Sequence, residues 1–138
     1  MKIEIQIGET RVQAQLLDNE AGREVYAQLP LESSYQVWGD EIYFSLPRGL
    51  STKGEREIVE VGDLAYWSPG KAFCIFYGRT PASEDERPRA ASKVTVFGKV
   101  EGDARIFRKV KGKRIIITAL KEEPKEKKEN STCTQNVI

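Results

Sequence analysis

Histidine is absent from the 138-residue sequence, and cysteine occurs only twice, at Cys74 and Cys133. Without histidine the chain has no imidazole to act as a general base or to activate a Ser or Cys nucleophile. Zinc sites that use histidine are excluded for the same reason, and neither CxxC spacing nor a thiol cluster is present. Two cysteines in different surroundings do not indicate a disulfide framework. The sequence therefore predicts no metal site.

The sequence also has no excess of charge of one sign, because 22 Lys and Arg residues are balanced by 21 Asp and Glu residues, which gives a net charge of +1. Such a chain has no general field that attracts nucleic acid or anionic membranes. No phosphate-binding glycine-rich motif points to a nucleotide cofactor. No run approaches the roughly 18 apolar residues of a membrane span, and the N-terminus lacks the apolar region of a signal peptide. We expect a cytoplasmic protein without cofactor, nucleic-acid partner or membrane contact.

The remaining composition is that of one folded domain with a charged C-terminal segment. Hydrophobic residues make up 39% of the sequence and charged residues 31%, and the length suits a single core. Residues 121–138, KEEPKEKKENSTCTQNVI, are rich in charge and contain no aromatic residue. We therefore expect a β domain over residues 1–120 and a disordered tail over 121–138.

Alternation of apolar and polar residues predicts a mainly β fold. Residues 2–7 and 10–16 alternate, and Gly8-Glu9 between them suits a two-residue type II′ hairpin. Six further strands are predicted, over residues 42–46, 57–61, 64–67, 71–77, 94–100 and 114–120. About eight short strands with little helix favour a closed barrel or a sandwich.

The connections are predicted from other signals. Asp18 and Asn19 can cap a helix, and apolar residues at four-residue spacing continue it up to Pro30. Residues 79–93 carry two prolines and seven charges, which predicts a long exposed loop. Residues 103–110 fit a short helical turn or another strand.

Aromatic residues gather in one third of the chain, with nine of the twelve between positions 35 and 77. The strand from Lys71 is apolar on both faces, with Phe73, Ile75 and Tyr77 alternating with Ala72, Cys74 and Phe76. Either the second face lines a concave binding site, or the helix of residues 19–29 or a loop covers it. The candidate ligand-binding residues are Tyr43, Tyr66, Trp67, Pro69, Phe73 and Phe76.

Three other groups of residues each have a purely structural and a functional interpretation. Cys74 lies among apolar residues, which favours a core position over a reactive thiol. Asp40, Glu41 and Asp63 stand beside glycines, which favours solvated turns over an acid–base pair. Residues 105–114, RIFRKVKGKR, form either a phosphate-binding patch or a basic face balanced by acidic residues elsewhere.

Three segments resemble a known family: LPLESSYQVWGDEIYFSLP (29–47), VEVGDLAYWSPGKAFCIFYGRTPAS (59–83) and VFGKV (96–100). They are similar to the small bacterial and archaeal cyclophilin-like family, a domain of unknown function. The resemblance covers most of residues 1–120. It implies a closed eight-stranded antiparallel barrel with one or two short helices, in agreement with the strand count above.

True cyclophilins are prolyl isomerases, and the resemblance allows a comparison of their pocket with this sequence. Their Gly-Ser-Gln-Phe-Phe-Ile strand matches residues 70–75, where Ala72 replaces the glutamine and Cys74 the second phenylalanine. Residues 34–38 offer no counterpart of the catalytic arginine, and Arg48 does not match its position. That arginine matters because a donor to the prolyl nitrogen weakens amide resonance.

We therefore expect the protein to bind a peptide or a small apolar ligand in an aromatic cleft without efficient catalysis. The alternatives are a divergent peptidyl-prolyl isomerase with another donor, and an assembly module whose apolar face is an oligomer interface. The sequence assigns no catalytic residue.

Overall fold

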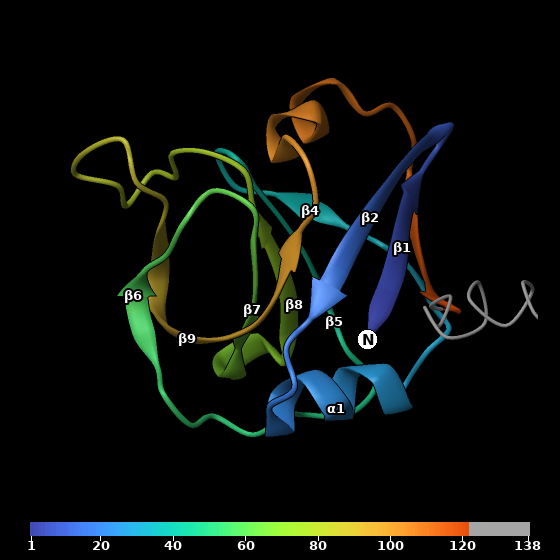
Figure 1. The fold of residues 1–138 in the computed structure, drawn as a ribbon. Coiled ribbons are helices and arrows are strands. Elements are labelled where there is room, and N and C mark those ends of the chain that lie inside the picture. The colour runs from blue at the N-terminus through green and yellow to red at the C-terminus, as the bar shows by residue number, and fades with distance from the viewer. Residues whose placement is uncertain (122–138) are drawn as a thin grey trace, which may run out of the picture.

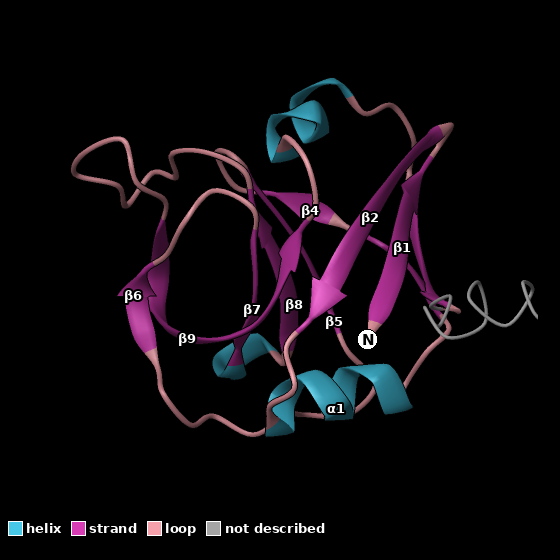
Figure 2. Cartoon of the chain, in the orientation of Figure 1, coloured by secondary structure: helices cyan, strands magenta, loops and turns pink. Residues whose placement is uncertain are grey.

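Ten β-strands, one α-helix and two short 3-10 helices make up the described part of the chain, residues 1–121, in a computed structural model (Figure 1, Figure 2). The strands are β1 (Lys2–Ile7), β2 (Thr10–Leu16), β3 (Leu31–Ser34), β4 (Gln36–Val37), β5 (Glu41–Ser45), β6 (Arg56–Ile58), β7 (Asp63–Trp67), β8 (Ala72–Phe76), β9 (Arg89–Val100) and β10 (Arg114–Leu120). The helices are α1 (Glu20–Ala27), η1 (Ser68–Gly70) and η2 (Ala104–Lys109). Apart from Lys121, the predicted tail and Cys133 lie outside the described residues.

The strands form one antiparallel sheet in the order β3-β10-β1-β2-β9-β7-β8-β5-β4, with β6 paired to β9. The mainly β, antiparallel prediction is confirmed, and all eight predicted strands are present. The predicted closed barrel is not confirmed: within residues 1–121 no backbone ladder joins β3 to β4, the two ends of the order. These ends are consecutive in the chain and separated only by Tyr35, so the sheet is split at that point.

The first hairpin forms where the sequence predicts it. Ile7 pairs with Thr10 across a two-residue turn, in which Gly8 has a φ of 59° and Glu9 a negative φ, as a type II′ turn requires. A Cβ atom on Gly8 would lie 2.0 Å from the carbonyl oxygen of Lys111. Both the turn geometry and this close approach therefore require glycine.

Helix α1 begins at the predicted cap. The Oδ1 atom of Asn19 accepts a hydrogen bond from the backbone N–H of Gly22 at 2.8 Å, which satisfies one free donor of the first turn. The Nδ2 atom of Asn19 donates to the carbonyl of Val96 at 3.2 Å, so the cap also ties the helix to β9. Ala21 and Val25 face the main core.

Two hydrophobic clusters lie on opposite faces of β8. Phe73 and Ile75 of β8 belong to the main core, to which β1, β2, β5, β7, β9, β10 and α1 also contribute. The smaller cluster consists of Val59, Ala65, Ala72, Cys74, Phe76, Ala90 and Val94. The two-sided burial of β8 agrees with its apolar pattern. Helix α1 packs on the main core, so it is not the element that covers the second face; β9 and the segment after β6 lie there instead.

The structure corrects the prediction for one connection and decides between two predictions for another. Strand β9 begins at Arg89, so the exposed loop is shorter than the predicted range of residues 79–93. Residues 104–109 form the 3-10 helix η2, which decides between the two options for that segment. No helix in residues 1–121 combines the length and apolar character needed to cross a membrane.

Candidate ligand-binding pocket

A pocket of about 260 Å³ opens on the second face of β8. Strand β5 contributes two lining residues at alternate positions, Glu41 and Tyr43, because side chains two apart share one face of a strand. Cys74 pairs with Tyr43 in the sheet register and forms part of the floor. The full lining is Trp38, Glu41, Tyr43, Trp67, Cys74, Ala90, Ala91 and Val94.

Hydrogen bonds orient two of the aromatic walls. The indole Nε1–H of Trp67 donates to Ser92 Oγ at 2.7 Å, and the hydroxyl of Tyr43 donates to Gln36 Oε1 at 2.8 Å. Trp38 and Trp67 are the two tryptophans of the sequence, and both line the pocket. The rings of Trp67 and Tyr43 thus form walls of the pocket while their polar atoms are bonded to residues outside its lining.

Glu41 places a carboxyl group in this apolar setting. The residue is 6% exposed, and no Lys or Arg within residues 1–121 forms an ion pair with it. Burial raises the pKa of Glu41 from 4.5 to about 7, and a hydrogen bond with the Cys74 thiol partly offsets that effect. Burial is the main reason why the pKa of Cys74 is raised well above its ordinary value, and the nearby charge of Glu41 raises it further. The thiol therefore stays protonated near neutral pH, whereas the carboxyl changes charge there.

Four of the six predicted binding residues lie apart from the lining. Tyr66 and Phe73 pack in the main core. Phe76 is fully buried in the smaller cluster, and Pro69 is exposed in η1. Of the predicted set, the structure brings Tyr43 and Trp67 together at the pocket. Their role in binding stays a prediction.

Sequence reasoning missed Trp38, Glu41 and the alanines of β9 as lining residues. The prediction that Glu41 and Asp63 are solvated turn residues is wrong, since each is only 6% exposed. Asp63 Oδ2 accepts the backbone N–H of Glu60 at 2.8 Å, and Oδ1 lies 3.5 Å from Lys99 Nζ. Two-residue alternation counted back from Tyr43 would have placed Glu41 on the pocket face.

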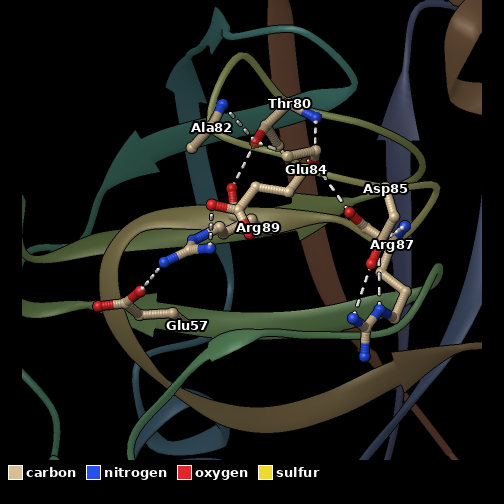
Figure 3. Close-up of polar contacts among 8 residues, drawn as sticks. Glu57, Thr80, Ala82, Glu84, Asp85, Arg87 and Arg89 are labelled. Atoms are coloured by element: carbon tan, nitrogen blue, oxygen red, sulfur yellow. Dashed lines mark hydrogen bonds and ion pairs between the residues drawn. The ribbon is translucent and has the colours of Figure 1, made fainter.

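The loop before β9 is held by its own polar contacts (Figure 3). The Thr80 hydroxyl donates to the carbonyl of Arg89 and accepts from the backbone N–H of Ala82. The guanidinium of Arg89 contacts Glu57 of β6 at 2.8 Å and Glu84 of the loop at 3.3 Å. These contacts fix the start of β9, the strand whose Ala90, Ala91 and Val94 form one wall of the pocket.

A second hollow lies at the split of the sheet. Its lining is Ser33, Ser34, Tyr35, Gln36, Tyr43, Phe44 and Ser45, and its volume is about 350 Å³. Hydroxyl and amide groups predominate there, so it lacks the apolar walls of the first pocket. Tyr43 belongs to both hollows.

The basic segment of residues 105–114 has acidic neighbours. Arg108 pairs with Asp40 at 2.9 Å, and Arg114 pairs with Glu32 at 3.3 Å. Arg105 is paired with Asp103 at 2.9 Å. This pairing favours the interpretation of a balanced basic face. In the described range, no three His, Cys, Asp or Glu side chains are grouped to hold a metal ion.

These features define the class of the protein: an antiparallel β protein with a split sheet and an aromatic pocket. The profile of the Cyclophilin-like family matches residues 1–118, and the chain belongs to this family, as its sequence motifs suggest. Among solved structures, the solution structure of a hypothetical protein from Archaeoglobus fulgidus is similar, with a TM-score of 0.67 and 31% sequence identity. The match covers 86% of this chain and 93% of the archaeal one. A comparison with curated proteins gives no significant match.

Proposed function

We propose that the protein binds a small apolar ligand, or an apolar side chain of a peptide, in the pocket beside β8. The observation that carries this proposal is the set of three aromatic residues, Trp38, Tyr43 and Trp67, around one hollow. Aromatic walls with a single convergent polar group are typical of ligand sites. The volume of about 260 Å³ lies just under the roughly 300–1,000 Å³ of pockets for drug-sized molecules, which favours a smaller ligand.

Prolyl isomerisation is the second candidate, and Glu41 is the residue that supports it. Isomerisation needs a donor to the prolyl nitrogen, and the lining residues include no arginine. A carboxyl group with a pKa of about 7 is partly protonated at neutral pH and can donate a hydrogen bond. An isomerase of this kind would therefore lose activity as Glu41 ionises.

The two candidates are separated by one NMR experiment with a panel of Xaa-Pro peptides and small apolar compounds. Binding predicts shifts of the Trp38 and Trp67 indole N–H signals, without acceleration of cis–trans exchange beyond its uncatalysed tens of seconds. Trp67→Leu should remove the shifts. Tyr26→Ala, which changes an exposed aromatic residue on α1, is the matched control and should leave them unchanged. Exchange that accelerates in the unmodified protein and stops in Glu41→Ala, which removes the donor, would establish the isomerase instead.

A further inference from the structure

We infer that the ligand of this pocket carries an alkylammonium cation, which the Glu41 carboxylate and the faces of the surrounding aromatic rings recognise together. The inference rests on the proposed binding function and specifies the chemical class of the ligand. The shared chemistry is a primary or methylated ammonium on an apolar stem. Such a group occurs on small amines and on the lysine side chains of peptides.

The first argument is charge. An ionised carboxylate in an apolar setting is costly unless a cation or several donors offset the loss of water. Asp63, which is equally buried, has the backbone N–H of Glu60 and Lys99 Nζ as partners. Glu41 has the neutral Cys74 thiol and no cation from residues 1–121. The protein thus provides counter-groups for one buried carboxylate and leaves the other, the one that faces a pocket, available to a ligand.

The second argument is the lining. Cations are attracted to the faces of Trp and Tyr rings, and this attraction grows when water is excluded. Trp38, Tyr43 and Trp67 surround the same hollow as Glu41. Ala90 and Val94 add methyl groups that suit the apolar stem or the methyl substituents of an ammonium ion. A hard metal ion would find one carboxylate and no further oxygen ligands of that kind, so this lining fits an organic cation better.

Glu41 is the one group in the lining that changes charge near neutral pH. Cys74 of β8 faces it with a pKa that burial raises well above the ordinary value, and Tyr77, directly after β8, has a pKa raised to about 12. Tyr43, on β5 itself, donates its hydroxyl to Gln36, and the neighbouring Asp40 is paired with Arg108. From β9, the lining residues are alanine and valine. Affinity for a cation should therefore fall about tenfold per pH unit below pH 7, as the carboxylate takes up its proton.

The test compares choline with 3,3-dimethylbutan-1-ol, its uncharged carbon isostere, by tryptophan fluorescence. Because both tryptophans line the pocket, the signal reports on this site. We expect choline to bind at least about tenfold more tightly than the alcohol at pH 8, and the preference to shrink at pH 5, where the ring faces alone attract the cation. Glu41→Gln should show the smaller preference at both pH values. Glu32→Gln, which removes an exposed carboxylate outside the pocket, should behave as the unmodified protein.

The outcomes separate the two proposals. Equal binding of choline and the alcohol at pH 8 overturns the cation inference and leaves the proposed binding function intact. No response to either probe, or to any member of the earlier panel, overturns both. If Glu41→Gln does not fold, NMR titration of the Glu41 carboxyl in the unmodified protein decides: choline should lower its pKa, and an unchanged pKa contradicts the inference. Nα-acetyl-trimethyllysine methylamide, tested beside choline, distinguishes a peptide side chain from a free small amine.

Discussion

The two faces of strand β8 are built from alternate residues of one short sequence, yet one face, the filled face, is packed throughout and the other, the hollow face, combines a small cluster with a pocket. On the filled face, Phe73 stacks on Phe44 with ring centroids 5.1 Å apart and meets Phe97 edge-on at 5.0 Å. On the other face, Phe76 is fully buried in the smaller cluster, whereas the short side chain of Cys74 forms part of the pocket floor. A short side chain between buried neighbours therefore leaves room for the pocket on this face.

Phe73→Ala should give the largest effect. Removal of a fully buried ring from the filled face should lower the free energy of unfolding by about 3–5 kcal/mol. Cys74→Ala, on the hollow face, removes one atom beside existing space and should cost about 1 kcal/mol or less. Urea unfolding of both variants measures the difference, and equal losses would mean that the two faces are packed alike.

The buried carboxylates give a second contrast, which depends on pH. Burial raises the pKa of Glu41 in the folded protein from 4.5 to about 7. The protonated carboxyl therefore contributes most to the free energy of unfolding below pH 4.5, and this contribution is lost as the pH rises to 7. At about 1.36 kcal/mol per pH unit, the loss is roughly 3 kcal/mol. Glu41→Gln should remove this pH dependence from urea unfolding measured between pH 4.5 and 8.

Asp63→Asn provides the opposite case for the same measurement. Its carboxylate already has partners, so the variant should be less stable than the unmodified protein by about 1–3 kcal/mol at pH 7. A Glu41→Gln variant that is destabilised as much as Asp63→Asn at pH 7 would contradict the idea that Glu41 lacks a counter-group.

Thr80→Val tests the loop that supports the hollow face. Its hydroxyl joins Arg89 to Ala82, so the variant loses two hydrogen bonds and should be destabilised by about 1–2 kcal/mol. The loss should be local, with faster amide hydrogen exchange at residues 81–91 and unchanged exchange in β1 and β10. Uniformly faster exchange throughout the sheet would show that the loop and the filled core unfold as one unit.

Tyr43→Phe should have the smallest effect. The hydroxyl bonds to Gln36 at an exposed position, so its removal should cost about 0.5 kcal/mol. The aromatic face that lines the pocket remains, and choline affinity should stay within twofold of the unmodified protein. A tenfold loss of affinity would show that the Gln36 contact is needed to orient the ring.

Sequence reasoning found the features that depend on local pattern. Residue patterns located β1, β2 and β5 to β10, Asn19 was identified as a possible helix cap, and the apolar residues of β8 indicated burial on both faces. Strand β4 was missed because two residues cannot display a period, and β3 was missed because its sequence, LESS, contains a single apolar residue. The start of β9 was missed because Arg89 and Lys93 make the segment appear solvated, whereas pairing with β6 determines its conformation.

The site was harder to predict because it depends on tertiary contacts. Tyr43 and Trp67 were recognised from the aromatic cluster, but Phe73 and Tyr66 belong to the same cluster and face the core. Glu41 follows Gly39 and Asp40, which suggests a turn, although the strand begins at Glu41 itself. The fold brings Ala90 and Ala91 to the pocket from a distant part of the sequence.

Strands β3 and β4 stand at the two ends of the sheet order, although they follow each other in the chain and no ladder joins them within residues 1–121. Tyr35 lies between them, and its hydroxyl donates to the carbonyl of Gly112 at 2.7 Å. The hollow at the split shares Tyr43 with the aromatic pocket. A substitution of Tyr43 therefore alters the lining of both hollows at once.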